Sequence, residues 1–341
     1  MGSNMKAEGC QVVITEQSGS IQLPKNLTVN EAVAFKQMFQ ELCQEHPDLK
    51  KADLDLKNTQ FIDSSGIGAL VNTWKVAKQK NVEFTLLNVT PQAMMTLTLA
   101  GLDQMLNIKK APKLPEEENS GQNGNISRKM LNRQQLPATH PSVQSKTKRF
   151  IDIIGALVGL CLTGILFVPI AIAIKLEDGG PILFGQTRCS WMGRRFQIWK
   201  FRSMVTDAEA LKHTIKNEVE GALFKNENDP RITKIGRLLR KTSLDEFPQF
   251  WNVLKGDMSL VGTRPPTPDE LERYEVPQWQ RLNVKPGITG EWQVYGRSSI
   301  KNFEDVIRLD LNYQEKWSLK YDLQLIFKTV AVIFDKDSGA Y

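Results

Sequence analysis

Hydrophobic residues follow two different periods along the first 110 residues. Residues 52–56 alternate apolar and polar side chains, and residues 82–87 form another short apolar-rich stretch, as expected of β-strands. Between such stretches the apolar positions recur every three or four residues, as at Phe35, Phe39 and Leu42, which predicts amphipathic helices. This part of the chain therefore alternates strands with helices.

Two of the predicted helices begin at polar capping sequences. Thr28-Val-Asn-Glu31 has the form of a capping box, in which the two side chains satisfy free amides at a helix start. Asp63-Ser64-Ser65-Gly66 precedes a second apolar helical face. We predict a small α/β domain over residues 1–110.

Residues 111–147 are rich in Pro, Gln, Asn, Ser and Gly and lack apolar periodicity. Such a composition buries too little apolar surface to offset the entropy of ordering the chain. We predict a flexible linker here.

An uncharged apolar run, 153–174, follows the linker and is long enough to span a bilayer. A single-pass helix is one interpretation. Basic residues lie on both sides, however, among them Lys148 and Lys175, so the positive-inside rule favours both ends in the cytosol. Because Pro169 interrupts the run, we prefer a re-entrant helical hairpin over residues 148–175 that enters and leaves by the same face.

The remaining residues, 176–341, mix strand and helix signals. Residues 196–199 predict a strand, and apolar spacing from Ile235 predicts a helix. Residues 316–331 place apolar residues among lysines, typical of a helix that packs on a core or lies among lipid headgroups. Packing on a core is the preferred interpretation.

Charge divides the chain unevenly. The net charge is +6, yet residues 1–110 hold as many lysines as acids and no arginine. A basic second half suits lipid headgroups or phosphates, with nucleic acid as an alternative at this level of argument. The four cysteines are scattered without metal-ligand spacing, so we predict free thiols in a reducing compartment.

The candidate catalytic residues are concentrated between Lys241 and Pro266. Two adjacent carboxylates, Asp245 and Glu246, lie near a predicted helix start among basic residues that include Arg264. A carboxylate can attack phosphorus when a metal and cations offset its charge. In an arbitrary protein the same pair is a solvated feature of a first helical turn. The surrounding cations suit a polyanionic substrate such as a diphosphate with a metal.

Several motifs occur in a fixed order from residue 146 onward. They are Lys148-Arg-Phe-Ile-Asp152, Gly180-Pro-Ile-Leu-Phe-Gly-Gln186-Thr-Arg188, Trp199-Lys200-Phe-Arg202-Ser203-Met204, Leu244-Asp245-Glu246, residues 284–298 and Gly339-Ala-Tyr341. In this series the chain resembles the bacterial sugar transferases, monotopic phosphoglycosyl transferases that act on polyprenyl phosphates. Residues 176–341 would then form a mixed α/β catalytic domain behind the re-entrant helix.

The resemblance implies a covalent mechanism. Asp245 would attack the sugar-bearing phosphorus of a UDP-sugar, UMP would leave, and polyprenyl phosphate would displace the phosphosugar from the aspartate. Glu246 would assist Mg²⁺ binding or proton handling, with Asp245 and Glu246 as metal ligands.

Four cations are candidate phosphate or nucleotide ligands: Lys200, Arg202, Arg264 and Arg297. Lys200 and Arg202 fall on one face of a strand, where a solvent-exposed basic face is the alternative. Two prolines stiffen the loop after Arg264, although Thr263 departs from the Gly-Pro-Arg-Pro pattern usual in the family. Gln186 and Arg188 are weaker candidates.

In the first domain, Phe61-Ile-Asp63-Ser64-Ser65-Gly66 and the elements around it resemble the STAS domain, of the anti-sigma-factor antagonist type. In that family the serine after the aspartate, here Ser64, is phosphorylated by a partner kinase. The alternative is that Asp63 or Ser64 only caps a helix.

The sequence therefore predicts an enzyme on the cytoplasmic face of the inner membrane that transfers a sugar 1-phosphate from a UDP-sugar to polyprenyl phosphate and initiates polysaccharide assembly. The expected partners are these two substrates, the inner leaflet, a regulatory protein or kinase at the STAS-like domain and a second copy in a homodimer, without nucleic acid. The alternative function is a membrane-anchored STAS signalling protein without turnover. The sequence does not specify the sugar.

Overall fold

The chain forms two compact units. The computed structural model describes residues 4–7, 9–15, 17–109, 139–218, 226, 228–296 and 302–334. The first unit comprises Met1–Thr139, Met192–Arg194 and Glu275–Gln280, and the second comprises His140–Trp191, Arg195–Tyr274 and Arg281–Tyr341. Most of the predicted linker lies outside the described residues. The prediction of a flexible linker up to residue 147 is wrong at its end, where Pro141–Gln144 form the helix α4.

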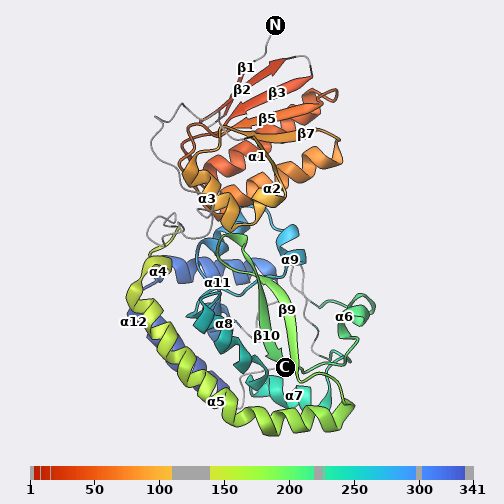
Figure 1. Ribbon diagram of the computed structural model, residues 1–341, viewed down its shortest axis with the longest axis vertical. Helices are drawn as coiled ribbons and strands as arrows, with labels where there is room; N and C mark the ends of the chain where they lie inside the picture. Colours follow the sequence, from red (N-terminus) through yellow and green to blue (C-terminus); the bar gives the residue numbers. More distant parts are fainter. Residues whose placement is uncertain are drawn as a thin grey trace, which may run out of the picture. The chain divides into compact units, whose positions relative to one another are not determined.

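A six-stranded sheet organises the first unit, in the order β1-β2-β3-β5-β7-β8 (Figure 1). The pairs β1–β2 and β2–β3 are antiparallel, and the remaining pairs are parallel. The strands are β1 (Asn4–Ala7), β2 (Cys10–Thr15), β3 (Ser18–Gln22), β5 (Lys51–Asp55), β7 (Glu83–Leu87) and β8 (Asn107–Lys109). A short parallel pair, β4 (Asn26–Leu27) and β6 (Phe61–Ile62), lacks a recognisable sequence pattern because each strand has two residues.

Three helices connect the parallel strands and pack on the sheet: α1 (Val29–Glu45), α2 (Ser64–Gln79) and α3 (Pro91–Leu99), with the 3₁₀ turn η1 (Leu102–Gln104) before the last strand. The capping box predicted at Thr28 and Glu31 is present. The core includes Phe35 and Phe39 of α1 and Leu54 and Leu86 of the sheet, all completely buried. This packing confirms an α/β domain in the first part of the chain.

The second unit is built around short strands and many helices. β9 (Leu183–Cys189) and β10 (Arg195–Phe201) form an antiparallel ribbon, and β11 (Ser259–Val261) pairs in parallel with β12 (Gly287–Thr289). Besides α4, the helical segments are α5 (Lys146–Asp178), η2 (Trp191–Gly193, partly in the first unit), α6 (Ala208–Leu211), η3 (Lys212–Thr214), α7 (Lys234–Lys241), η4 (Leu244–Gln249), α8 (Phe250–Lys255), α9 (Pro268–Glu272), η5 (Val276–Asn283, partly in the first unit), α10 (Glu291–Tyr295), α11 (Phe303–Lys316) and α12 (Leu319–Phe334). This is the mixed α/β arrangement that the sequence predicts.

Helix α12 combines both interpretations of its sequence. Leu325 is buried in a cluster with Val261, Val284 and Tyr313. Phe327 on the same helix is 72% exposed. One face of α12 therefore packs on the core, and another presents apolar side chains outward.

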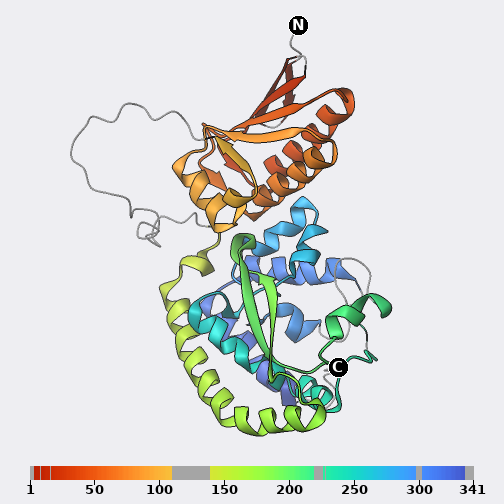
Figure 2. The same ribbon diagram turned by 45° about the vertical axis from the view of Figure 1, so that its right-hand side comes forward.

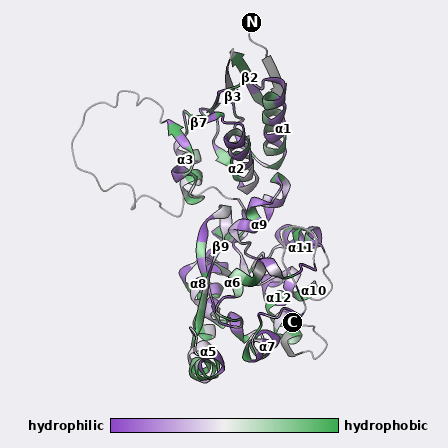
Figure 3. Ribbon diagram, turned by 90° about the vertical axis from the view of Figure 1, so that its right-hand side faces the viewer, coloured by the Kyte–Doolittle hydropathy of each residue, from purple (hydrophilic) through white to green (hydrophobic). Residues whose placement is uncertain are grey.

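Helix α5 is the one described helix that is long and apolar enough to cross a membrane. It is a single helix of 33 residues with Pro169 inside it, rather than two helices joined by a break. Figures 1 and 2 show that it bends sharply, as expected where a proline removes a backbone hydrogen bond. Its exposed apolar side chains are Phe150, Ile154, Leu157, Val158, Leu162, Ile165, Val168, Ile172 and Leu176. Figure 3 shows the hydropathy of this helix.

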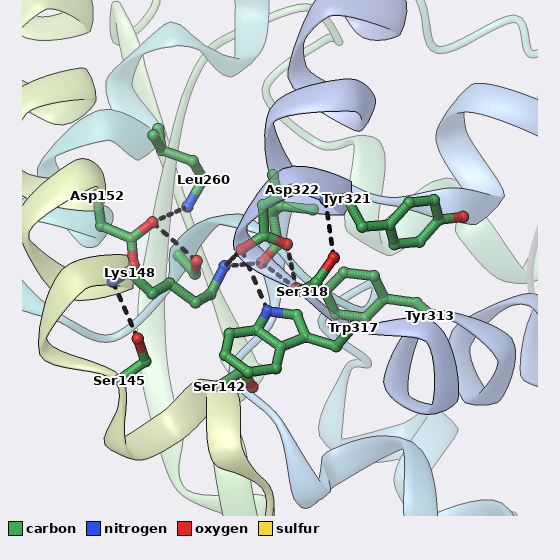
Figure 4. Close-up of polar contacts among 12 residues, drawn as sticks. Ser142, Ser145, Lys148, Asp152, Leu260, Tyr313, Trp317, Ser318, Tyr321 and Asp322 are labelled. Carbon is green, nitrogen blue, oxygen red and sulfur yellow. Dashed lines mark hydrogen bonds and ion pairs between the residues drawn. The ribbon is translucent and has the colours of Figure 1, made fainter.

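The amino-terminal end of α5 is fastened into the second unit by buried polar contacts (Figure 4). Lys148 Nζ donates to Asp322 Oδ2 of α12 at 2.6 Å and to the Val261 carbonyl at 3.1 Å. Asp152 Oδ1 accepts from the Ser259 hydroxyl and the Leu260 amide, both at 2.9 Å. Burying these charges is tolerated because each has a charged or hydrogen-bonding partner.

Candidate active site

Asp245 and Glu246 lie in the first turn of η4. Ser243 precedes this turn in the left-handed region, with φ of 56°, and the Glu246 amide donates to its carbonyl at 3.3 Å. Acids are favoured in a first helical turn because free backbone amides point toward them. The Asp245 side chain is nevertheless buried, with 6% of its surface exposed, and it lines a cavity. The solvated pair expected in an arbitrary protein is therefore not what the structure contains.

The cavity has a volume of about 380 Å³ and lies within the second unit. The strands β9 and β10, the helix α7, the turn η4 and the segment from Arg264 to Glu270 contribute to its wall. Its charged and amide-bearing lining residues are Gln186, Arg188, Lys200, Arg202, Glu209, Arg231, Arg240, Asp245, Glu246, Arg264 and Glu270. Three of the four predicted phosphate ligands thus meet beside the two predicted acids.

Each of these three cations has a carboxylate partner in the structure. Lys200 Nζ lies 2.8 Å from Glu246 Oε1. Arg202 pairs with Asp178, the last residue of α5. Such pairing leaves further donors on each guanidinium, because arginine carries five N–H groups.

Arg264 is held by Glu270 in a two-point contact. Its Nη1 and Nη2 donate to Glu270 Oε2 and Oε1 at 2.7 and 3.0 Å. Burial alone would raise the pKa of Glu270, but the charge and hydrogen bonds of Arg264, aided by Arg188, lower this pKa to about 2. Burial opposes the charge of Arg264, yet Glu270 raises the pKa of the guanidinium, so both groups remain ionised.

The backbone at and just before Arg264 is held by contacts with residues from other parts of the second unit. Gly262 lies so close to the Lys285 carbonyl that a Cβ at this position would clash. Thr263, which departs from the family pattern, is buried and donates from its hydroxyl to the Arg281 carbonyl at 3.2 Å. Arg281 in turn donates to the Arg264 carbonyl at 3.1 Å and pairs with Asp310. The substitution to threonine therefore preserves a tightly held loop.

Arg188 is a stronger member of the site than its sequence suggested. Its guanidinium donates to Gln186 Oε1 at 2.7 and 3.0 Å and to the Pro265 carbonyl at 2.9 Å. Burial, followed by the like charge of Arg264, lowers the pKa of Arg188 to about 10. Two guanidinium groups held close together are unfavourable alone and become favourable when an anion lies between them.

Sequence reasoning did not assign Arg231 or Glu270 to the site, and it named Arg240 only as a nearby cation that offsets the charge of the two acids. Arg240 Nε donates to the Ser203 hydroxyl at 2.9 Å. Burial lowers the pKa of Arg240 while the charge of Asp245 opposes this shift. The proximity of Arg240 to Asp245 in the chain was visible, but α7 and η4 had to be folded before their shared cavity could be seen.

The predicted Mg²⁺ ligands, Asp245 and Glu246, fit a metal ion that is also bound by substrate phosphates and water. Among the residues that the structure describes, no group of three or more His, Cys, Asp or Glu side chains could hold a metal ion. Mg²⁺ is commonly bound by one or two carboxylates, with substrate phosphates and water completing its shell. Asp245 and Glu246, both in the cavity wall, fit that mode.

Two further predictions concern Arg297 and Ser64. Arg297 and the carboxyl-terminal motif lie beyond the described residues. Ser64 is the first residue of α2, and its side chain is buried. Asp63 is the N-cap, and its Oδ1 accepts from the Gly66 amide at 2.9 Å.

Comparisons with known proteins agree with this architecture. The model of the bacterial sugar transferase family matches residues 143–336, and that of the STAS domain matches residues 10–113. The first match covers more than half of the chain, so the protein belongs to the bacterial sugar transferase family. Its first unit is STAS-like.

Three curated relatives each match slightly more than half of the chain. In the order in which they are named next, their identities to this chain are 52, 43 and 40%, and the matches cover 54, 57 and 54% of its length. They are the galactosyl transferase CpsE of Streptococcus agalactiae, the undecaprenyl-phosphate galactose phosphotransferase of Salmonella typhimurium and the UDP-glucose:undecaprenyl-phosphate glucose-1-phosphate transferase of Escherichia coli. The chain covers only 42, 41 and 39% of these relatives.

One solved structure, that of the anti-sigma factor antagonist SpoIIAA in its unphosphorylated form, is similar to 30% of this chain at 17% identity. The match covers 89% of that chain, with a TM-score of 0.26.

Proposed function

We propose that this protein transfers a sugar 1-phosphate from a UDP-sugar to polyprenyl phosphate, with Asp245 as the nucleophile. The observation that carries the proposal is a buried carboxylate in the wall of a cavity lined by Lys200, Arg202 and Arg264. Such a cavity suits a diphosphate, whose charge would otherwise repel the attacking carboxylate. The names of the relatives, which specify undecaprenyl phosphate and galactose or glucose, support the substrate class.

The reaction divides into two displacements at phosphorus. A carboxylate oxygen of Asp245 forms a bond to the sugar-bearing phosphorus, and the bond from that phosphorus to the bridging oxygen breaks. UMP leaves with the bridging oxygen. An oxygen of polyprenyl phosphate then bonds to the same phosphorus, and the aspartyl oxygen is released as a carboxylate. Covalent catalysis of this kind replaces one difficult step with two easier ones.

The surrounding residues hold and neutralise the phosphates. Arg264, fixed by Glu270 and by its rigid loop, offers its guanidinium without further ordering. Glu246 is paired with Lys200, whose charge offsets that of this second carboxylate close to the first. Bound Mg²⁺ would supply additional charge neutralisation at the diphosphate, with Asp245 and Glu246 as its protein ligands.

The geometry of α5 supports a re-entrant position in the membrane. Both ends of this helix are tied into the second unit, through Lys148 at one end and Asp178 at the other. A helix crossing the bilayer once would leave its two ends on opposite faces. We therefore place both ends on the cytoplasmic face of the inner membrane, with the bend inside the lipid. Cysteine labels before Lys146 and after Lys175 should both react only from the cytosolic side.

The adduct on Asp245 gives the most direct test. Purified full-length protein in detergent is mixed with a panel of UDP-sugars, including UDP-galactose and UDP-glucose, without acceptor. Intact-mass and peptide mass spectrometry should then show one phosphosugar on the peptide that contains residue 245, and added undecaprenyl phosphate should remove it.

A Glu304→Gln variant serves as the control, because Glu304 is exposed on α11 and does not line the cavity. A label on another side chain would refute the assignment of Asp245. Absence of UMP release with every donor would favour the alternative, a membrane-anchored STAS signalling protein. The STAS-like unit would in either case be the place for a regulatory protein, a kinase acting on Ser64 or a contact with a second copy.

A further inference from the structure

The carboxyl-terminal end of the membrane helix α5 reaches the wall of the cavity. Asp178, its last residue, pairs with Arg202, which follows β10 directly. The Arg202 side chain is 6% exposed, and the Asp178 side chain is 28% exposed. A cation of the candidate active site is therefore anchored by a residue of the membrane element.

The neighbouring acid, Glu177, contacts the start of α7, another element that contributes to the wall of the same cavity. Its carboxylate accepts from the Lys234 amide at 2.6 Å and from the Ile235 amide at 3.1 Å, at the start of α7. Helix α7 carries Arg240, another lining residue. Figure 1 shows this end of α5 beside α7. Glu177 and Asp178, at the end of α5, thus contact α7 and the residue after β10, and each of these segments contributes an arginine to the cavity.

The chain after α5 is shaped to bring Asp178 and Arg202 together. Gly179 ends the helix with φ of 70°, a conformation that side chains rarely adopt, and the Gly180 amide donates to Asp178 Oδ1 at 3.2 Å. A Cβ at Gly180 would collide with the Arg202 guanidinium. The turn therefore orients the carboxylate and leaves room for its partner.

An anchored guanidinium binds phosphate more readily than a free one. An arginine side chain loses rotamer freedom when it is ordered. Because Asp178 restrains Arg202 beforehand, less of this loss remains when a phosphate binds. Nη1 of Arg202 is buried and has no hydrogen-bond partner among the described residues.

We propose that Asp178 is a positioning residue, which holds Arg202 in the orientation that binds the donor diphosphate and so couples the cavity to the membrane helix. The inference rests on the proposed function in naming the diphosphate as the ligand. The opposite effect is physically reasonable, since a carboxylate beside Arg202 also repels a phosphate. The two interpretations predict opposite signs, so one substitution separates them.

The test compares Asp178→Ala, Asp178→Asn and Glu304→Gln in full-length protein reconstituted in lipid nanodiscs. Positioning predicts that Asp178→Ala raises the KM for the UDP-sugar about 10-fold, as expected for losing the support of a charge-assisted hydrogen bond. It predicts a much smaller change in kcat. Asp178→Asn keeps an acceptor oxygen and should fall between wild type and alanine, while Glu304→Gln should match wild type. An unchanged or lowered KM in Asp178→Ala would overturn the proposal.

A double-mutant cycle with Arg202→Ala identifies the partner. If Asp178 acts through Arg202, removing the carboxylate in the Arg202→Ala background should alter the KM by less than about 2-fold. Additive effects of the two substitutions would contradict the proposal. Gly180→Ala provides a second variant, because its Cβ displaces the guanidinium and should also raise the KM.

Calorimetric titration with UDP tests the role of Asp178 independently of the proposed reaction, because binding of UDP requires no turnover. If wild type binds UDP without turnover, the proposed reaction fails, and the Kd for UDP in the same variants still decides the role of Asp178. Weaker binding in Asp178→Ala would support positioning. Equal or tighter binding, or no binding of UDP by wild type, would refute it.

Discussion

Two aspartates near helix starts, Asp63 in the first unit and Asp245 in the second, are almost equally buried, at 7 and 6% exposure. Asp63 is the N-cap of α2 and accepts from the Gly66 amide, a local contact three residues away. Asp245 lies inside the first turn of η4, whose N-cap is Ser243, and faces a cavity lined by cations from other elements. Burial is alike in the two cases. The groups contributed by distant parts of the chain distinguish the structural carboxylate from the proposed nucleophile.

The largest expected effect is that of Asp245→Asn on turnover. The amide keeps the size of the side chain but cannot act as the nucleophile, so UMP release should fall by at least about 10³-fold. UDP binding and thermal unfolding should change little, because the cations that line the cavity remain. Turnover within 10-fold of wild type would remove the distinction between the two aspartates.

Asp322, a structural carboxylate of the second unit, should matter for stability, in contrast to Asp245, which should matter for turnover. Lys148→Met leaves Asp322 buried without its ion-pair partner and should lower the free energy of unfolding by about 3–5 kcal/mol. Denaturant unfolding of the detergent-solubilised protein measures this loss. The double variant Lys148→Met/Asp322→Leu should recover most of the lost stability, whereas a double variant as unstable as the single one would show that the charge pair is not the cause.

Glu270 lies between these extremes, because it lines the cavity and supports the fold. Its pKa is about 2, below its ordinary value of 4.5. A lowered pKa stabilises the folded state fully above pH 4.5, and this stabilisation is lost as the pH falls from 4.5 toward 2. It amounts to about 3 kcal/mol at most.

Thermal unfolding between pH 6 and pH 3 checks the effect. The melting temperature of wild type should fall more steeply on acidification than that of Glu270→Gln, which lacks the titrating group. Parallel curves for the two proteins would show that Glu270 does not contribute in this range.

The smallest effect is expected for Asp63→Ala. Loss of an N-cap costs about 1 kcal/mol, which corresponds to about 4–8 °C in the melting temperature of a domain of this size. Calorimetry of the full-length protein should show this shift in the first unit, while UMP release stays unchanged. Asp63→Asn, which can still cap, should remain close to wild type. A loss of turnover in Asp63→Ala would mean that the first unit affects catalysis.

Much of the fold was determined by short-range features of the sequence. The apolar periods predicted the main strands and helices of the first unit, and the Thr28 capping box was confirmed because its contacts span three residues. Hydropathy located α5 as a helix long and apolar enough to cross a membrane, since apolar length alone decides that property. The motifs also indicated Lys200, Arg202 and Arg264 as members of one site, and these three residues do line one cavity.

Other features depended on contacts between residues far apart in the chain. The pairing of Arg202 with Asp178, 24 residues away, and the bending of α5 as one continuous helix could not be deduced from local patterns. Glu270 completes a capping box with Thr267, and the fold also places its carboxylate against Arg264, a contact that no local pattern predicts. Periodicity and capping reflect the energies of neighbouring residues, so the sequence determined them by itself. Charge pairing and cavity shape reflect distances across the folded chain, and only the tertiary structure decided them.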